Sequence, residues 1–211
     1  MMSHAHGCVI STIFLSLGSR CLTACEDKVI NVYRVDDASL LYNLRGHQQS
    51  IILLQTDEQT ATAQTASEDG TIRLWDLLTG ACIHKLSGLI GPVLNLQISS
   101  NYIAASSLES LICIWDKSNG RMLHSIHRTN TSFTGAIAII ADSLLISGGA
   151  HNTLYFWDLE CGELVYTIQL PITNNCEGVS KLTVVDGSTL VIAVGSHIYS
   201  IVFPHLSPDR L

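Results

Sequence analysis

The sequence predicts an all-β fold that is built from repeated units of four short strands, arranged as the blades of a β-propeller. Three segments, SEDGTIRLWDLLTG, LESLICIWDKSNG and AHNTLYFWDLECG, share one pattern. Each ends an apolar strand with Trp-Asp and then reaches a turn glycine. The repeated pairs are Trp75 and Asp76, Trp115 and Asp116, and Trp157 and Asp158. A repeat of about 40 residues that closes a strand with Trp-Asp is typical of propeller blades.

Two degenerate copies extend the repeat in both directions. Tyr33 in CEDKVINVYRVDDA and Ile201 in GSHIYSIVF stand where the tryptophan is expected, so the five positions are separated by 42, 40, 42 and 44 residues. We therefore predict one domain, a partial propeller over residues 1–211. Its units are 5–45, 46–87, 88–127, 128–171 and 172–204, followed by a tail at 205–211.

The strands are predicted from short apolar runs between turn residues. In chain order they are 9–15, 22–25, 29–34 and 40–44; 51–55, 62–67, 72–76 and 82–86; 93–98, 103–106, 111–116 and 122–126; 136–140, 144–147, 154–158 and 164–170; and 181–185, 190–194 and 198–203. Many of these runs are apolar at successive positions, which indicates strands that are covered on both faces. Stacking one blade against the next provides that cover.

The fifth unit contains three predicted strands where the others contain four. A propeller closes when one blade combines strands from both ends of the domain, which leaves no long unpaired edge. We therefore expect the chain to be part of a larger ring of seven or eight blades, with upstream blades missing from this chain. Closure of the five units alone is the alternative, and it would leave one blade with three strands.

Composition limits the function classes. The chain is 47% hydrophobic and 14% charged, which allows a large core and argues against disorder. The net charge of −7, with 11 scattered Lys and Arg residues, argues against nucleic-acid binding. The apolar run at residues 8–17 is too short to span a bilayer, so we expect no membrane insertion by this segment. The seven cysteines lie singly and without metal or redox spacing, which favours reduced thiols in the cytosol.

One set of polar residues in the second unit has the types and spacing of a buried hydrogen-bond network. The expected order runs from the Asp69 carboxylate to His47, then to the Ser67 hydroxyl and finally to the Trp75 indole N–H. His47, Asp69 and a serine also suggest part of a catalytic triad. Because the chain has no Gly-x-Ser-x-Gly elbow, we predict a structural role and no catalytic residue.

Metal and cofactor sites are not predicted. The nine histidines show no ligand spacing beside carboxylates, apart from His4 and His6 at the terminus. No glycine-rich loop precedes a helix, so no phosphate site is expected. Asp76, Asp116 and Asp158 are interpreted as caps of the turns that lead to the following glycines.

The chain resembles WD-repeat propellers over its whole length. The features that carry this resemblance are the three Trp-Asp pairs, Gly46-His47 and the segment SEDGTIRLWD. Within them, LICIWDKSNGRMLHSI and DSLLISGGAHNTLYFWDLECGELVYTI are similar to the C-terminal propeller of the Scap family of sterol-sensing escort proteins. This resemblance implies a role in sterol and cholesterol metabolism, on the cytosolic face of endoplasmic reticulum and Golgi membranes. It also implies an upstream membrane region, and a partner in the regulatory domain of the sterol regulatory element-binding protein precursor.

Two function classes follow from these observations. A non-catalytic protein-interaction platform is favoured, and a propeller enzyme would require convergent acids, histidines or a metal. A generic WD-repeat adaptor, such as a substrate adaptor of a ubiquitin ligase, is the alternative. Propeller partners often engage the turns before the third strands. The candidate contact residues are Glu26, Lys28, Glu68, Leu108, Glu109 and His151.

Overall fold

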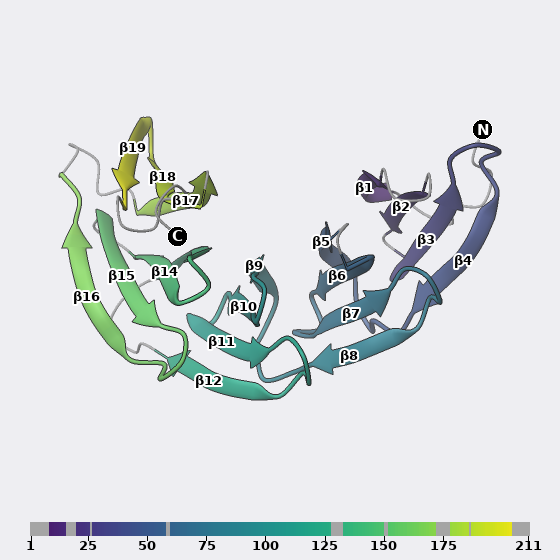
Figure 1. Ribbon diagram of the computed structural model, residues 1–211, viewed down its shortest axis with the longest axis horizontal. Coiled ribbons are helices and arrows are strands. Elements are labelled where there is room, and N and C mark those ends of the chain that lie inside the picture. The colour runs from purple at the N-terminus through teal and green to yellow at the C-terminus, as the bar shows by residue number, and fades with distance from the viewer. Residues whose placement is uncertain are drawn as a thin grey trace. The chain divides into compact units, whose positions relative to one another are not determined.

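The computed structural model describes residues 9–15, 20–25, 27–57, 60–127, 133–149, 152–171, 178–185 and 187–203. In these ranges the chain forms antiparallel sheets, four with four strands each and one with three (Figure 1). Consecutive strands pair within each sheet, as expected of propeller blades. The predicted all-β propeller fold is therefore confirmed.

The chain divides into two compact units, Met1–Val93 and Leu94–Leu211. The first unit contains two sheets. Their strands are β1 (Val9–Leu15), β2 (Arg20–Cys25), β3 (Val29–Arg34) and β4 (Leu40–Arg45), then β5 (Ile51–Asp57), β6 (Thr62–Ser67), β7 (Ile72–Asp76) and β8 (Cys82–Leu86). β5 packs beside β1 and β2. The buried cluster between these sheets includes Leu22, Ile30 and Leu44 from one sheet and Ile51 and Trp75 from the other.

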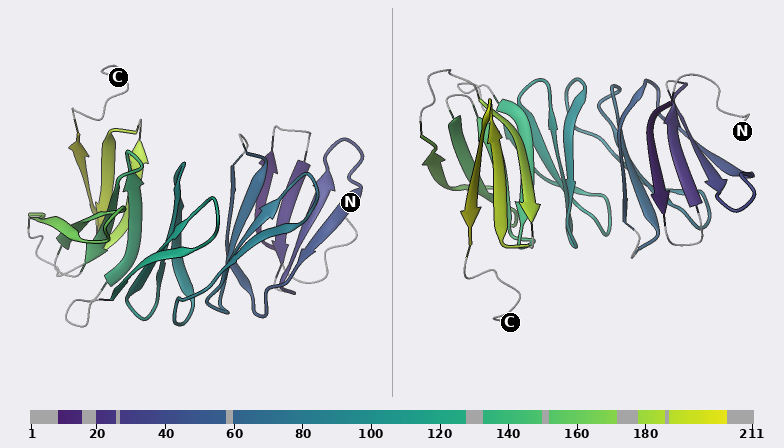
Figure 2. Two further views of the ribbon diagram at one scale, coloured as in Figure 1. Left: turned by 60° about the horizontal axis from the view of Figure 1, so that its bottom comes forward. Right: turned by 90° about the horizontal axis from the view of Figure 1, so that it is seen from above.

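The second unit contains the remaining sheets, and the turned views show the strands of each sheet side by side (Figure 2). The third sheet has β9 (Val93–Ile98), β10 (Tyr102–Ser107), β11 (Leu111–Asp116) and β12 (Met122–His127). The fourth has β13 (Phe133–Ile140), β14 (Leu144–Gly149), β15 (Thr153–Asp158) and β16 (Leu164–Gln169). The fifth has β17 (Val179–Val185), β18 (Thr189–Val194) and β19 (His197–Val202).

Two buried clusters hold the second unit together. Ile112 and Ile114 of the third sheet pack with Leu145 and Trp157 of the fourth. On its other face, the fourth sheet packs against the fifth, and Leu190, Ile192 and Val194 of β18 belong to this cluster. The alternation of strand side chains explains why the fourth sheet contributes to a core on both of its faces.

A register shift recurs beside the tryptophan of each repeat. The ladder between the third and fourth strands is irregular at Trp75, Trp115 and Trp157, and also at Tyr33. Such β-bulges increase the local twist and redirect side chains. β13 begins at Phe133, three residues before the predicted start, because a register shift between Phe133 and Ile137 accommodates Gly135 at φ 78°.

The turn after the third strand requires a left-handed residue. Gly80, Gly120 and Gly162 occupy this position at φ 76°, 71° and 75°, and Ala38 occupies it in the first sheet at φ 56°. An L-residue with a Cβ is strained in this region, whereas glycine is not. The sequence copy around Tyr33 lacks the glycine, so the first sheet carries the strain.

Replacing Ala38 by glycine is therefore expected to stabilise the protein by up to about 1 kcal/mol, because the strain of the left-handed Ala38 is removed. Urea denaturation of the wild type and Ala38→Gly measures this difference. Ala81→Gly is the matched control, since Ala81 is exposed and has no positive φ. An equal gain in both variants would show that the backbone conformation of Ala38 is not the cause.

Candidate functional site

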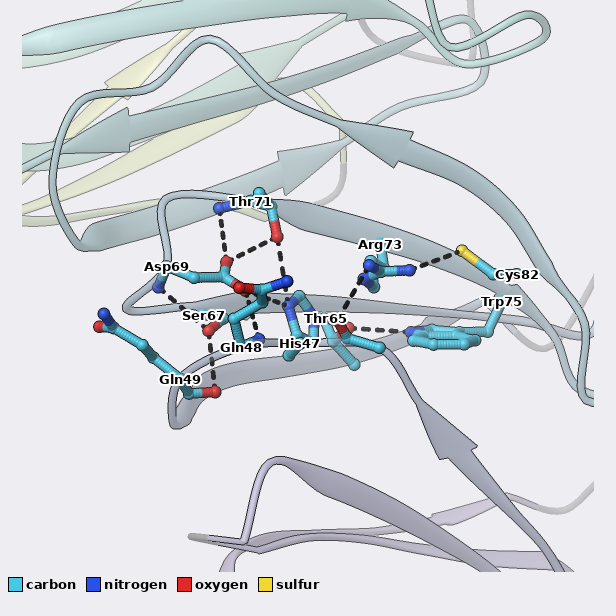
Figure 3. A network of polar contacts seen from close by, with 11 residues as sticks. His47, Gln48, Gln49, Thr65, Ser67, Asp69, Thr71, Arg73, Trp75 and Cys82 are labelled. Atoms are coloured by element: carbon cyan, nitrogen blue, oxygen red, sulfur yellow. Dashed lines mark hydrogen bonds and ion pairs between the residues drawn. The ribbon is translucent and has the colours of Figure 1, made fainter.

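The polar network of the second sheet surrounds His47. This residue precedes β5 and is 6% exposed. Figure 3 shows His47 between the β6–β7 turn, which carries Asp69 and Thr71, and Thr65 of β6. Trp75 of β7 approaches Thr65 from the other side. The network therefore ties the segment before the first strand of this sheet to its second and third strands.

Thr65 lies at the centre of the network. Its Oγ1 is 2.7 Å from Nε2 of His47 and accepts a hydrogen bond of 2.9 Å from the indole Nε1 of Trp75. A carboxylate can only accept, so in neutral His47 the nitrogen that faces Asp69 is protonated and the Thr65 hydroxyl donates to the other nitrogen. Nδ1 of His47 then carries the proton and lies 3.4 Å from Oδ2 of Asp69. A neutral His47 thus satisfies both of its ring nitrogens.

Thr65 occupies the place in the network that the sequence-based interpretation gave to Ser67. Ala63 is opposite Trp75 in the β6–β7 ladder, and Thr65 is two residues farther on the same face. Ser67 is four residues farther, about 13 Å along the strand at 3.3 Å per residue, which exceeds the reach of the indole. The Ser67 hydroxyl instead donates to the Gln49 carbonyl and accepts from the Asp69 N–H.

The Asp69 carboxylate organises the segment around the β6–β7 turn. It accepts hydrogen bonds from Gln48 N–H at 2.7 Å, from Thr71 N–H at 2.9 Å and from the Thr71 hydroxyl at 2.6 Å. Burial raises the pKa of Asp69, but these hydrogen bonds outweigh it and lower the pKa to about 2. Asp69 is therefore a charged anchor at neutral pH.

Burial lowers the pKa of His47, and the neighbouring Asp69 carboxylate offsets only part of this effect. The folded protein thus binds a proton at His47 less readily than the unfolded chain, whose histidines titrate near pH 6.5. The stability that this difference provides is complete above about pH 6.5 and decreases as the pH falls below that value.

Between pH 7.5 and 5.5 we expect the wild type to lose stability, with a contribution from His47 of at most about 1.4 kcal/mol per pH unit. His47→Gln removes this contribution. The difference between the urea midpoints at the two pH values should therefore be smaller in the variant. The reverse sign, with the wild type gaining stability at pH 5.5 relative to the variant, would show that His47 is protonated in the folded state.

A related hydrogen bond is present in the fourth sheet. Trp157 Nε1 donates to the Ser147 hydroxyl at 2.9 Å, and this serine precedes its tryptophan by ten residues, as Thr65 precedes Trp75. In the third sheet the equivalent position is Ala105, which has no hydroxyl. A Ser or Thr ten residues before the tryptophan is therefore the sequence signal that identifies this partner.

The Asp residues that follow the tryptophans organise the turns after the third strands. Asp76 accepts from Leu78 N–H and from the Thr79 hydroxyl, at 2.8 and 2.6 Å. Asp116 accepts from Ser118 N–H at 2.8 Å, and Asp158 from Glu160 N–H at 2.7 Å. Hydrogen bonds lower the pKa of all three carboxyl groups. Each carboxylate is thus hydrogen-bonded within its own turn.

The same turns also connect neighbouring sheets within a unit. The Tyr42 hydroxyl of β4 donates to the Leu77 carbonyl in the β7–β8 turn. In the second unit, Nε2 of His124 on β12 is 2.8 Å from the Glu160 carbonyl in the β15–β16 turn. The fourth strand of one sheet is thereby fastened to the next sheet in the chain.

Across the part of the chain that the structure describes, no three His, Cys, Asp or Glu side chains come together as a potential metal site. The same residues include no helix that is long and apolar enough to cross a membrane. Burial raises the pKa of the Cys113 thiol to about 11, so this thiol is protonated at neutral pH.

Four of the candidate contact residues lie in turns between second and third strands. Lys28 precedes β3, Glu68 follows β6, and Leu108 and Glu109 connect β10 to β11. All four are exposed, and Leu108 retains 61% of its accessible surface. Glu26 and His151 lie outside the described residues. The side chains at the four described positions are accessible to solvent, whereas the network next to Glu68 is buried.

Comparison with known proteins gives several matches. A family model described as the SCAP β-propeller matches residues 2–203. The sterol regulatory element-binding protein cleavage-activating protein of Xenopus laevis is 31% identical over 193 residues, which cover 92% of this chain and 14% of that protein. Mitochondrial division protein 1 of Neurospora crassa is 25% identical over 169 residues, covering 64% of this chain and 26% of that protein.

A solved structure shows the fold alone. The crystal structure of the computationally designed Ika8 protein matches with a TM-score of 0.74 and 22% identity, over 92% of this chain and 58% of that chain. The family match extends over nearly the whole chain and includes all the repeats described above. The chain therefore belongs to the SCAP β-propeller family.

Proposed function

We propose that this chain is a non-catalytic protein-interaction platform that binds the regulatory domain of the sterol regulatory element-binding protein precursor. In this proposal, binding serves the transport of the precursor from the endoplasmic reticulum to the Golgi. The chain acts on the cytosolic face of these membranes, as the propeller of a longer, sterol-regulated escort protein. The observation that carries the proposal is the match to the SCAP β-propeller over residues 2–203.

The division between buried and exposed polar groups supports a binding role. The His47 imidazole and the Thr65 hydroxyl are bonded within the framework, and Ser67 bonds to backbone groups. Exposed charged and apolar side chains are available at the turns, including Glu68 and Leu108. Loops on a rigid scaffold commonly carry binding residues. We therefore assign partner contacts to the turns before the third strands, with Glu26, Lys28, Glu109 and His151 as further candidates.

A generic WD-repeat adaptor is the second candidate function. The observation that favours it is the similarity to WD-repeat proteins with other names, such as the DENN domain and WD repeat-containing protein SCD1 of Arabidopsis thaliana. That protein is 28% identical over 127 residues, which cover 58% of this chain and 10% of its own length. An adaptor would use the same turns for a different partner.

Affinity capture distinguishes the two functions. The longer protein that contains this chain, immobilised from detergent-solubilised membranes, is expected to retain the transcription-factor precursor. Glu68→Lys and Leu108→Asp should reduce that recovery. Glu160→Lys is the control and should not reduce it, because Glu160 is exposed in the β15–β16 turn, which follows a third strand. Recovery of ubiquitin-ligase subunits without the precursor would contradict the escort function and favour the adaptor.

A further inference from the structure

Two cationic residues lie directly opposite each other in the second sheet. Arg73 of β7 pairs with Lys85 of β8 in the antiparallel ladder, so the two side chains project from the same face of the sheet. Like charges in directly opposed positions are destabilising. Within the described part of the chain, neither side chain forms an ion pair. The ladder therefore brings two positive charges together without an acidic residue that balances them.

The same positions are uncharged in the other three four-stranded sheets of the described chain. The equivalent cross-strand pairs are Asn31 and Asn43 in the first sheet, Cys113 and Ser125 in the third, and Tyr155 and Thr167 in the fourth. The two asparagines hydrogen-bond to each other. The repeat itself therefore does not require cations at these positions, and the pair in the second sheet has a separate cause.

The guanidinium group of Arg73 is held in place. Its Nη2 donates to the Gly46 carbonyl at 3.0 Å, and its Nη1 is 3.5 Å from Sγ of Cys82. Its Cζ lies 5.7 Å from the centre of the Trp75 ring (Figure 3). A Cβ at Gly46 would approach this Cζ to 2.6 Å, so glycine permits the close contact. A guanidinium that is already ordered loses less entropy when it binds an anion.

Arg73 retains hydrogen-bond donors that no acceptor uses. Its buried Nε–H has no partner among the described residues. Each terminal nitrogen carries two N–H groups and makes one of the two contacts given above, so each has a second N–H to offer. Lys85 is exposed, and its ammonium group adds further donors. The pair thus combines unbalanced positive charge with free donors, which are the two requirements of a site for an oxyanion.

The charge of the two cations extends to the neighbouring network. Burial is the main cause that lowers the pKa of His47, the Asp69 carboxylate opposes it, and Arg73 and Lys85 lower this pKa further. Both cations therefore act on one small region, although the net charge of the chain is −7. An anion bound to them would raise the pKa of His47, and this change provides a measurable signal.

We propose that Arg73 and Lys85 form a binding site for a phosphate dianion that is carried by a phosphorylated serine or threonine of a protein partner. The guanidinium offers planar donors that match two phosphate oxygens, and the ammonium adds a point charge. A phosphate monoester carries a charge of about −1.5 to −2 at pH 7, so it balances both cations, whereas a carboxylate balances one. The site does not depend on which partner carries the phosphate, and it therefore does not rest on the escort function.

A phosphorylated side chain fits this site better than an anionic membrane does. Membrane surfaces attract clusters of about four to eight Lys and Arg residues. Here a single pair of cations belongs to a chain with a net charge of −7, which an anionic surface repels. Lys85 is exposed and Arg73 is half-buried, so one phosphate group that approaches past Lys85 meets both side chains.

A nuclear magnetic resonance titration of the 211-residue chain with N-acetyl-phosphoserine amide at pH 7.5 tests the site. The backbone signals of Gly46 and Cys82, which contact Arg73, are expected to shift, and the pKa of His47 should rise. Lys85→Gln should weaken binding about tenfold, because one of the two cations is lost. Lys181→Gln is the matched control, since Lys181 is exposed on β17, and it should leave the affinity unchanged.

Two further comparisons separate geometry from charge. Arg73→Lys keeps the positive charge but removes the planar donors, so it should bind the phosphoserine probe more weakly than the wild type does. N-acetyl-aspartate amide carries a single negative charge and should bind the wild type about tenfold more weakly than the phosphoserine probe. Circular dichroism establishes that each variant is folded before its affinity is compared.

The outcomes divide clearly. Probe-induced shifts at Gly46, together with weaker binding in folded Lys85→Gln, support the site. Equal affinities of the wild type and either variant, or of the phosphoserine and aspartate probes, would overturn it. Tighter binding of inorganic phosphate than of the phosphoserine probe would contradict a phosphorylated side chain and indicate a site for the free ion. Lys85-dependent binding to phosphatidic acid vesicles, without binding of the probe, would contradict it in favour of a membrane.

Discussion

Replacing Thr65 by valine is expected to lower the free energy of unfolding by about 2 to 4 kcal/mol. The substitution removes one hydroxyl that serves both the His47 imidazole and the Trp75 indole. Two buried polar groups then lose their partner, and each such loss costs about 1 to 3 kcal/mol. Valine nearly matches threonine in shape, so little of the loss would come from a cavity. Urea denaturation at pH 7.5 measures the change.

Thr167→Val provides the matched control for this substitution. Thr167 lies on β16 and is exposed, so the same chemical change should alter stability by less than about 0.5 kcal/mol. Comparable losses in the two variants would contradict a central role for the Thr65 hydroxyl. A Ser147→Ala variant should show an intermediate loss, because Ser147 serves the Trp157 indole.

Asp69→Ala is expected to cost about 3 kcal/mol at neutral pH, since hydrogen bonds to a charged acceptor contribute about 1.5 to 3 kcal/mol each. Its carboxylate holds the Gln48 and Thr71 N–H groups and the Thr71 hydroxyl. The pKa near 2 is below the unfolded value of about 3.9. Its stabilisation is therefore present above about pH 4 and is lost as the pH falls toward 2.

The two parts of this prediction have separate readouts. Thermal unfolding at pH 7 should show a clear decrease in melting temperature for Asp69→Ala, and an unchanged melting temperature would contradict the anchoring role. Between pH 4 and 2, the wild type should lose more stability than the variant. Asp36→Ala, at an exposed residue, is the control and should behave as the wild type.

The fold could be predicted from the sequence because its repeat is physically redundant. Trp75, Trp115 and Trp157 are buried at the same place in three sheets, and the Asp that follows each one forms the same turn. Each copy thus reports the same strand and turn independently. The boundaries assigned to the five units, and the larger ring, stay predictions. The structure forms two compact units, Met1–Val93 and Leu94–Leu211.

The network was less predictable because residue type alone does not give distance along a strand. Thr65 and Ser67 both offer a hydroxyl on the same face of β6, and the β6–β7 register decides which one meets Trp75. The exposure of Ile198 could not be predicted from the sequence either, since its sequence context matches that of the buried Ile112. Ile112 is covered by the sheet that follows it in the chain, whereas no sheet follows the fifth among the described residues.

In the proposed function, the exposed turns bind the precursor and the buried network only supports them. Calorimetric titration of the precursor's regulatory domain into the propeller-containing protein tests it most directly. Binding should persist in Thr65→Val, at a temperature where this variant is folded, with an affinity within about twofold of the wild type. Glu68→Lys should weaken binding several-fold without changing stability. No binding to the folded wild type, or unchanged affinity in Glu68→Lys with loss in folded Thr65→Val, would contradict the account.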